Sequence, residues 1–423
     1  MELFGRTKIY TDVSEITRAN VVDVINAALP VFKTNSEQIN KLYDYYKGKQ
    51  NILNRDKPIR PEITNKVVVN RANEIVTFKV SYLLGEPLQY VARSKDNKIS
   101  DEINMLNEIM YSEDKASKDK EIADWLHICG VAYRLVLPDK NGEEENSPIS
   151  IFTLNPMETF VIYYSGVGNK AIAGVNRIKM ASGEVVYSVY SKNRYFEIKG
   201  GKVISEKPTA LSSVPIIEYI HNEARMGAFE PVITLLDAIN TVESSRIDAI
   251  EQFVQSILIF ENCAIDKEKY DQLRKDGALL VKSDNQTPAK VYRVGDELAQ
   301  GGTQTVVDDL YNAILTICGM PSQGNGNSSD SSNNGAVIMR NGWQSAEARA
   351  KDTETLFKRS EQEFLKLVLN ICNATKHINL TLGQIEQKFT RQNYSDILSK
   401  SQVLTTMLAN PKIHPQLAFT ICG

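Results

Sequence analysis

Residues 232–258 read VITLLDAINTVESSRIDAIEQFVQSIL, and this stretch decides the fold. It contains no Gly or Pro, and its apolar residues recur every three or four positions, which predicts a long helix. At about 100° per residue its polar side chains project to the opposite side, and that face carries no Lys or Arg. For this helix alone, the simplest interpretation is the solvated face of an amphipathic helix. The polar face comprises Asp237, Asn240, Thr241, Ser244, Asp248, Glu251, Gln252 and Gln255.

A compact insert follows this helix. Residues 257–261 predict a short strand, residues 266–275 a short charged helix, and residues 278–282 and 289–293 two more strands. Residues 303–318 then repeat apolar pairs at helical spacing, which predicts a second apolar-faced helix. The pattern is therefore two helices joined by a small βαββ insert.

Residues 320–342 are dominated by Gly, Ser and Asn. A loop of roughly twenty residues without periodicity is rare inside a compact domain, and it is usually a working loop or a disordered linker. It contains no GxxxxGK[ST] pattern, which excludes a P-loop for nucleotide phosphates. Residues 343–372 then predict a helix of roughly 45 Å, at 1.5 Å per residue.

The composition is that of an ordinary globular protein with two or three domains: 423 residues, 42% hydrophobic and 24% charged. It has no run of eighteen apolar residues and no apolar signal segment at its start, so we expect neither membrane insertion nor secretion. The net charge of −3 and the pI of about 6.0 provide no dominant basic stripe for DNA phosphates. If DNA is a partner, we expect it to be held loosely.

The cysteines and histidines indicate no catalytic or metal site. The five cysteines are far apart and mostly within apolar runs, which predicts buried free thiols in a reducing compartment. His127 and Cys129 are the closest pair of potential ligands, but two residues apart on a helix they face different directions. No GxSxG or GxGxxG motif occurs. We therefore expect no enzyme, no metal and no cofactor.

The first half of the chain combines helices with an antiparallel sheet, which makes the fold class α+β. Asn141 and Gly142 give a strong hairpin signal between strands at 131–137 and 149–154. Helical patterns lie at 16–29, 36–46, 70–84, 99–111 and 118–129. A meander of strands is predicted at 159–163, 172–178, 185–190, 194–198 and 202–204.

Several motifs, in this order and at this spacing, resemble the SPP1-type portal proteins of tailed phages. Each motif alone is weak, but the combination is specific and spans nearly the whole chain. The motifs are Tyr45-Tyr46-Lys47-Gly48, Asn70 and Ala72 followed by IVTFKVSYLLGEP at 75–87, PIIEY at 215–219, residues 233–240 with Leu236-Asp237-Ala238, and Gly335-Ala336-Val337-Ile338 before a long helix.

The resemblance implies a portal fold with a mixed helical and antiparallel β wing, long stem helices, a small α/β clip and a helical crown. The implied divisions are a wing at 1–225, a first stem helix at 226–257, a clip at 258–300, a second stem helix at 301–318, a tunnel loop at 319–342, a long wing helix and wing return at 343–390, and the start of a crown at 391–423. The apolar run at 417–422 suggests a short or truncated crown.

The resemblance also implies the function of a ring, typically of twelve subunits, at one capsid vertex. Such a ring nucleates head assembly, passes double-stranded DNA without sequence specificity during packaging and ejection, and ends in the virion after assembly in the host cytoplasm. The implied partners are other copies of the chain, the terminase large subunit, major capsid and scaffolding proteins, and a head–tail connector or adaptor, with no membrane.

Three sets of residues are the candidate sites under this interpretation. Acidic and polar stem residues facing DNA would discourage sticking through repulsion of the phosphates. The proposed channel lining is Asp237, Ser244, Asp248, Glu251 and Gln255; the tunnel loop is Asn325, Asn327, Ser328, Ser329, Asp330, Asn333 and Asn334; and the clip docking surface is Asp266, Lys267, Glu268, Lys269 and Arg274.

Two alternatives from other classes stay open. A minor capsid or head protein that forms no ring would share the helices and the meander, although it would give no reason for an acidic stem face. A nucleic-acid enzyme would need clustered carboxylates for a metal or a phosphate-binding loop, and the sequence shows neither pattern. Ring formation separates the first alternative, and a divalent-dependent nuclease assay separates the second.

Overall fold

The computed structural model describes residues 5–94, 96–139, 147–254, 257–262, 267–268, 271, 288, 290–294, 300–322, 342–375, 378–391 and 397–422. The chain divides into two units, each described by itself. Unit 1 comprises Met1–Lys49, Asn70–Thr234 and Asn312–Gly423, and unit 2 comprises Gln50–Val69 and Leu235–Tyr311. The observed fold is a mixture of helices and mainly antiparallel sheets, as the sequence predicts.

The meander predicted from the sequence is confirmed in unit 1. Within the described residues it forms a six-stranded sheet in the order β1-β5-β6-β7-β8-β9, antiparallel from β5 to β9. The short strand β1 was not predicted, and it pairs with β5 in parallel. The strands are β1 (Ile9–Thr11), β5 (Thr159–Tyr164), β6 (Ala171–Lys179), β7 (Val185–Ser191), β8 (Arg194–Lys199) and β9 (Lys202–Pro208).

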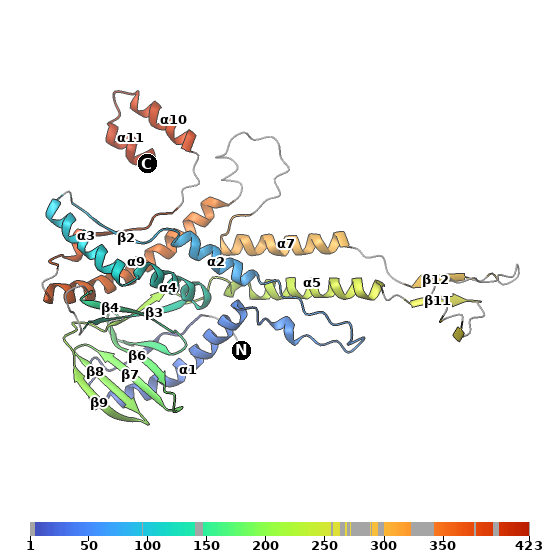
Figure 1. Ribbon diagram of the computed structural model, residues 1–423, viewed down its shortest axis with the longest axis horizontal. Helices are drawn as coiled ribbons and strands as arrows, with labels where there is room; N and C mark the ends of the chain where they lie inside the picture. Colours follow the sequence, from blue (N-terminus) through green and yellow to red (C-terminus); the bar gives the residue numbers. More distant parts are fainter. Residues whose placement is uncertain are drawn as a thin grey trace. The chain divides into compact units, whose positions relative to one another are not determined.

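One helix, α1 (Val21–Tyr46), packs against this sheet where two helices were predicted (Figure 1). Pro30 lies inside the helix and removes one backbone hydrogen bond, yet the buried face continues past it from Val21 to Tyr45. Phe32 stacks on Phe160 of the sheet with ring centroids 4.5 Å apart. Apolar packing on both sides of Pro30 therefore keeps the helix continuous where the sequence predicted a break.

The hairpin predicted around residues 131–154 is also confirmed, but it belongs to a separate sheet. β3 (Val131–Pro138) pairs with β4 (Ile149–Leu154) on one side and with β10 (Ile216–Ile220) on the other. The helices α3 (Asn97–Ser112) and α4 (Lys115–Cys129) contribute to the core that this sheet shares with the long helix near the C-terminus.

Gly130 joins α4 to β3 and has a positive φ of 82°. A Cβ there would lie 2.3 Å from the Arg225 carbonyl oxygen, so only glycine fits.

The long helix α9 (Trp343–Ala374) confirms the helix predicted from residue 343. Its buried apolar side chains belong to the same core as those of β3 and β10. After α9 the chain returns as β13 (Ile385–Lys388), which pairs antiparallel with β2 (Gln89–Ala92). The remaining elements of unit 1 are α2 (Arg71–Leu83), η2 (Glu230–Val232), η3 (Leu382–Gln384), α10 (Ile397–Leu408) and α11 (Pro415–Cys422).

Unit 2 contains most of the two helices that the sequence placed around the insert. α5 (Ile233–Val254) begins in unit 1 and continues in unit 2, whereas α7 (Gln300–Cys318) begins in unit 2 and ends in unit 1; both lie close to their predicted bounds. Between them, β11 (Ile257–Glu261) and β12 (Lys290–Val294) lie at two of the three predicted strand positions, and they pair antiparallel. Of the helix expected at 266–275, residues 267, 268 and 271 are described and are helical. The strand expected at 278–282 lies outside the described residues.

None of the helices in the described part of the chain combines the length and the apolarity that a membrane span requires.

Candidate functional site

An extended segment of unit 2 lies along the polar face of α5. We call residues Gln50–Val69 the strap; they include the short 3-10 helix η1 (Asn51–Asn54). Three alternate backbone amides of the strap, at 65, 67 and 69, donate to side chains four residues apart on α5. The hydrogen bonds are Val69 N to Asn240 Oδ1 (2.8 Å), Val67 N to Ser244 Oγ (3.0 Å) and Asn65 N to Asp248 Oδ1 (2.7 Å).

The spacing of these three bonds follows from backbone geometry. Four helical residues advance about 6 Å, and two extended residues advance about 6.6 Å. The polar side chains that repeat every four residues on α5 therefore meet every second amide of the strap. Buried backbone amides require hydrogen-bond acceptors. For the strap, side chains of α5 supply the acceptors that a neighbouring strand would supply in a sheet.

Asp248 is the most heavily bonded residue of this contact. It is 3% exposed and forms ion pairs with Arg55 (2.9 Å) and Lys57 (3.1 Å). It also accepts the hydrogen bond from the backbone amide of Asn65. Burial raises the pKa of Asp248, but the hydrogen bonds from Asn65 and Lys57 and the charge of Arg55 outweigh it and lower that pKa overall. Asp248 is therefore ionised and fixed under the strap.

The polar face of α5 is covered at two of the five residues that the sequence analysis expects to line a channel. Ser244 and Asp248 are 0% and 3% exposed because the strap covers them. Asp237 is half-buried and accepts a hydrogen bond from Asn51 (2.7 Å), whereas Glu251 is exposed and accepts one from Asn65 (3.2 Å). The fifth residue, Gln255, lies outside the described residues. Sequence periodicity showed where the face is but not that the chain itself covers it.

Apolar side chains of α5 and α7 reach the surface of unit 2. Ile247 and Ile250 of α5 are 37% and 41% exposed, and Val306 of α7 is 49% exposed. α5 and α7 lie side by side (Figure 1). The Arg246 guanidinium of α5 donates to Gln304 of α7 across 2.9 Å. Arg246 also pairs with Glu243, three residues earlier on the same helix, at 3.7 Å.

The expected clip and tunnel-loop residues are described only in small part. Lys267 and Glu268 are exposed, while Asp266, Lys269 and Arg274 lie outside the described residues. Every expected tunnel-loop residue between 325 and 334 also lies outside them. The described residues on either side of this segment lie close together: a Cβ at Gly342 would lie 3.6 Å from Met320 O.

A buried ionic cluster, which the sequence did not reveal, fixes α9 in unit 1. Glu361 of α9 is 0% exposed; it pairs with Lys115 of α4 (2.7 Å) and Arg134 of β3 (3.3 Å) and accepts a hydrogen bond from Tyr219 (2.7 Å). Burial raises the pKa of Glu361, but the charges of Lys115 and Arg134 outweigh it and lower the pKa to about 2. Asp119 pairs with the same two cations, so the charges balance inside the core.

The cysteines that the structure describes with their surroundings agree with the prediction of buried free thiols. Cys129, Cys318 and Cys372 are buried and unbridged. Burial raises the pKa of Cys129 to about 12 and those of Cys318 and Cys372 to about 11, so these thiols are protonated at neutral pH and unreactive.

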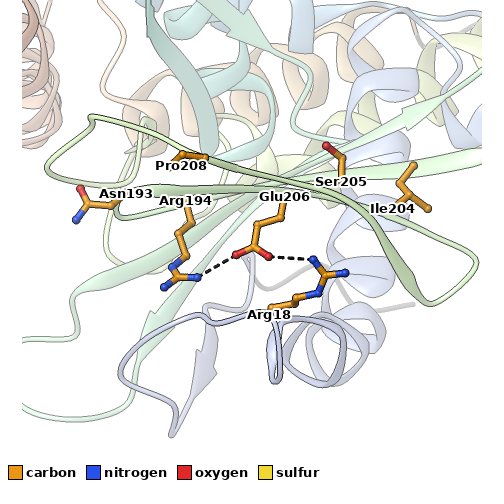
Figure 2. A pocket seen from close by; sticks show the side chains of 7 residues that line it. All are labelled: Arg18, Asn193, Arg194, Ile204, Ser205, Glu206 and Pro208. Carbon is orange, nitrogen blue, oxygen red and sulfur yellow. Dashed lines mark hydrogen bonds and ion pairs between the residues drawn. The ribbon is translucent and has the colours of Figure 1, made fainter.

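A hollow of about 550 Å³ lies beside the edge strand β9 of the six-stranded sheet (Figure 2). Glu206 occupies its middle and pairs with Arg194 (2.9 Å) and Arg18 (3.2 Å). Glu206 therefore compensates part of the charge of the two arginines, and Asn193 and Ser205 add polar groups to the lining. Within the described residues there is also no cluster of three or more His, Cys, Asp or Glu that could hold a metal ion.

Two solved structures are similar to this chain in fold. They are the "Neck of empty GTA particle computed with C6 symmetry" (TM-score 0.48) and the "Virion of native gene transfer agent (GTA) particle" (TM-score 0.45). Each is 10% identical, and each match covers 83% of this chain and 89% of the other. No curated protein matches the sequence.

The sequence itself matches a family model over most of its length. The model described as "Phage portal protein, SPP1 Gp6-like" aligns with residues 29–421, which include parts of both units, the strap and both stem helices. A match over nearly the whole chain identifies the family, as the motifs at 45–48, 70–87 and 215–219 indicated. The chain is therefore a member of the SPP1 Gp6-like family of phage portal proteins.

Proposed function

We propose that copies of this chain assemble into a ring that forms the DNA channel at one vertex of a phage capsid. The observation that carries this proposal is the family match over residues 29–421. In this role the ring nucleates head assembly, docks the terminase motor, passes DNA during packaging and ejection, and later holds the head–tail connector. It acts as a conduit and not as an enzyme, in the virion and, during assembly, in the host cytoplasm.

The exposed apolar residues of the stem helices support association between copies. Ile247, Ile250 and Val306 are between 37% and 49% exposed in one chain. Burying apolar surface stabilises an interface by about 25 cal/mol per Å². A ring repeats this gain at every subunit boundary, so modest patches suffice to close it.

The acidic residues that the strap leaves accessible support a channel surface that does not hold DNA. Asp237 is half-buried and Glu251 is exposed, and the strap adds exposed Asp56. Of the other charged strap residues, Arg55 and Lys57 pair with Asp248 and Arg60 pairs with Glu62, while Lys66 is exposed. Repulsion of phosphates by Asp237, Glu251 and Asp56 lets the duplex slide. In this revised proposal Ser244 and Asp248 hold the strap and do not line the channel.

The tunnel loop at 319–342 and the clip complete the proposal. Small polar residues between 325 and 334 would contact the moving duplex. Lys267 and Glu268, which are exposed, would belong to the docking surface for the motor or the connector.

Native mass measurement of the purified chain tests the ring directly. We expect a single large species whose mass is a fixed multiple of 47.4 kDa and is unchanged on dilution. Monomers that persist at high concentration would contradict the proposal and favour a head protein that forms no ring.

A further inference from the structure

The strap is a braced loop that doubles back on itself beside α5 (Figure 1). Three of its side chains tie the two arms together, because each donates to a backbone carbonyl oxygen of the opposite arm. The hydrogen bonds are Arg55 Nη1 to Asn65 O (3.1 Å), Lys57 Nζ to Ile63 O (3.0 Å) and Lys66 Nζ to Leu53 O (2.9 Å). Arg55 and Lys57 also pair with Asp248 of α5, which fixes the base of the loop.

The apex of this loop holds an apolar side chain outward on a restricted backbone. Residues 58–61 read Pro-Ile-Arg-Pro, and we call them the strap tip. Each proline has a fixed φ, and Arg60 between them has a φ of 52°, which is strained for a residue with a side chain. The amide of Ile63 donates to Arg60 O (3.0 Å) and closes the turn. Ile59 is 77% exposed at the apex.

The bracing and the strain of the strap tip indicate a contact more strongly than its exposure does. A single exposed apolar residue is ordinary on a protein surface. Strained backbone, however, gathers at segments that bind. A loop that is already held in one conformation also loses little entropy when it binds. Ile59 therefore has the properties of a preorganised apolar anchor.

A second apolar surface lies on the opposite side of α5. The strap is bonded to α5 down to Asp248, and Ile250 follows two residues later. At about 100° per residue this places Ile250 on the other side of the helix. Ile250 is 41% exposed, and Val306 of the adjacent α7 is 49% exposed. Unit 2 thus presents an apolar projection on one side of α5 and an apolar surface on the other.

The charges beside these two surfaces are complementary. The strap tip carries Arg60 and no acidic residue. Arg60 pairs only loosely with Glu62, at 3.4 Å and with the glutamate side chain 62% exposed, and such surface pairs contribute little. α7 carries two acidic residues, both exposed, and no Lys or Arg. A basic, apolar tip therefore matches an acidic, apolar helix face.

We propose that the strap tip of one copy packs on the Ile250–Val306 surface of the next copy. This inference rests on the ring assembly proposed above, and it names the contact that joins its subunits. A ring closes through a heterologous contact, in which two different surfaces of each subunit meet. Two complementary surfaces on opposite sides of α5 supply such a contact. Asp248, which anchors the strap, thereby also positions the contact between copies.

Cysteine cross-linking of the full-length protein tests which surfaces meet. Ile59→Cys is combined in turn with Ile247→Cys, Ile250→Cys or Val306→Cys, and the rings are treated with a short bis-maleimide. We expect at least one pair to give a ladder of covalent multimers in denaturing electrophoresis, because a heterologous contact links each copy to the next. The wild-type protein and each single variant control for native cysteines. Ile204→Cys with Ile250→Cys, which pairs two exposed positions outside the proposed contact, should give no ladder.

Charge at the strap tip tests whether the contact stabilises the ring. We expect Ile59→Asp to lower the share of chains in rings at least tenfold in native mass spectra, because every boundary would then bury a carboxylate. Ile59→Leu, which keeps the tip apolar, should retain the rings. Val167→Asp, which changes another exposed apolar residue in the turn between β5 and β6, should retain them as well. Circular dichroism confirms that each variant is folded.

The outcomes separate this contact from the ring itself. Rings that persist in folded Ile59→Asp, with no ladder from any of the three cysteine pairs, would overturn the contact and leave the ring proposal intact. Covalent dimers from Ile59→Cys alone would also overturn it, since they would place two strap tips against each other. Wild-type protein that stays monomeric would instead contradict the ring proposal, and the contact with it.

Discussion

Asn65 donates its backbone amide to Asp248 Oδ1 across 2.7 Å and thereby fastens the strap to α5. The same residue donates its side-chain amide to Asp248 (2.9 Å) and to Glu251 (3.2 Å). One asparagine therefore connects two turns of the helix. The polar face of α5 consequently has a structural use within a single chain.

Removing the Asp248 carboxylate should loosen the strap. Asp248→Ala leaves Arg55, Lys57 and the Asn65 amide without their acceptor, so we expect a loss of about 1–3 kcal/mol in the free energy of unfolding. Urea denaturation measures it. Asp309→Ala, which removes an exposed carboxylate of α7 away from the strap, is the control and should change stability by about 0.5 kcal/mol or less. Equal effects of the two changes would show that the strap contact contributes nothing.

The buried cluster around Glu361 should make stability sensitive to acid. Because the folded-state pKa of about 2 lies below the unfolded value, its contribution is fully present above about pH 4.3 and is lost as the pH falls through 2. We expect the free energy of unfolding to decline over this window. Glu361→Gln should flatten the decline, although it also destabilises the protein at neutral pH by about 3–5 kcal/mol because two buried cations lose their partner.

The exposed neighbour Glu363 provides the matched control for that experiment. Its side chain is 59% exposed and pairs only with Lys366 among the described residues. Glu363→Gln should keep the acid-induced decline of the wild-type protein. A variant at Glu361 with an unchanged pH profile would contradict the assignment of the acid sensitivity to the buried cluster.

Two glycines with the same backbone conformation should respond differently to alanine. Gly130 and Gly183 have φ values of 82° and 84°, but a Cβ at Gly130 would meet Arg225 O at 2.3 Å, whereas one at Gly183 would meet open space. Both changes introduce strain of about 1–2 kcal/mol. Only Gly130→Ala adds a backbone clash, so we expect it to lower the melting temperature clearly more. Equal decreases in melting temperature would contradict the close approach of Gly130 to the Arg225 carbonyl oxygen.

Replacing the exposed Ile247 and Ile250 of α5 by charged residues should prevent ring closure without unfolding the subunit. We expect Ile247→Asp combined with Ile250→Asp to convert the assembly to smaller species in native mass spectra, because each boundary would then bury a carboxylate. Ile204→Asp is the control, since this residue is 55% exposed on the edge strand β9. Rings that survive the double change would exclude these side chains from the subunit boundary.

Reversing the accessible acidic charges should slow DNA without affecting assembly. Asp237→Lys combined with Glu251→Lys introduces cations beside the proposed channel, and each added phosphate contact strengthens binding. We expect intact rings but fewer filled heads, measured as packaged DNA per capsid. Asp56→Lys alone should have a smaller effect. Normal packaging by the double variant would contradict the proposed lining.

Local patterns predicted the elements of this chain well. α5, the β11–β12 pair and the meander from β5 to β9 follow from periodicity and turn residues within short windows. Periodicity alone failed at Pro30, because packing on both sides keeps α1 continuous.

Contacts between distant segments could not be predicted from one sequence. The strap has no periodicity of its own, and its partners on α5 are more than 170 residues away. The parallel pairing of β1 with β5, the pairing of β2 with β13, and the Glu361 cluster depend in the same way on where remote segments meet. For the candidate site, the sequence predicts a polar face on α5 but not that the strap covers part of it.

Electron cryomicroscopy of the purified full-length chain tests the central claim most directly. The account predicts a closed ring with an axial opening wide enough for a DNA duplex, with Asp237 and Glu251 of every subunit bordering that opening and Ser244 and Asp248 beneath the strap. Single subunits, or an open assembly without an axial passage, would contradict it.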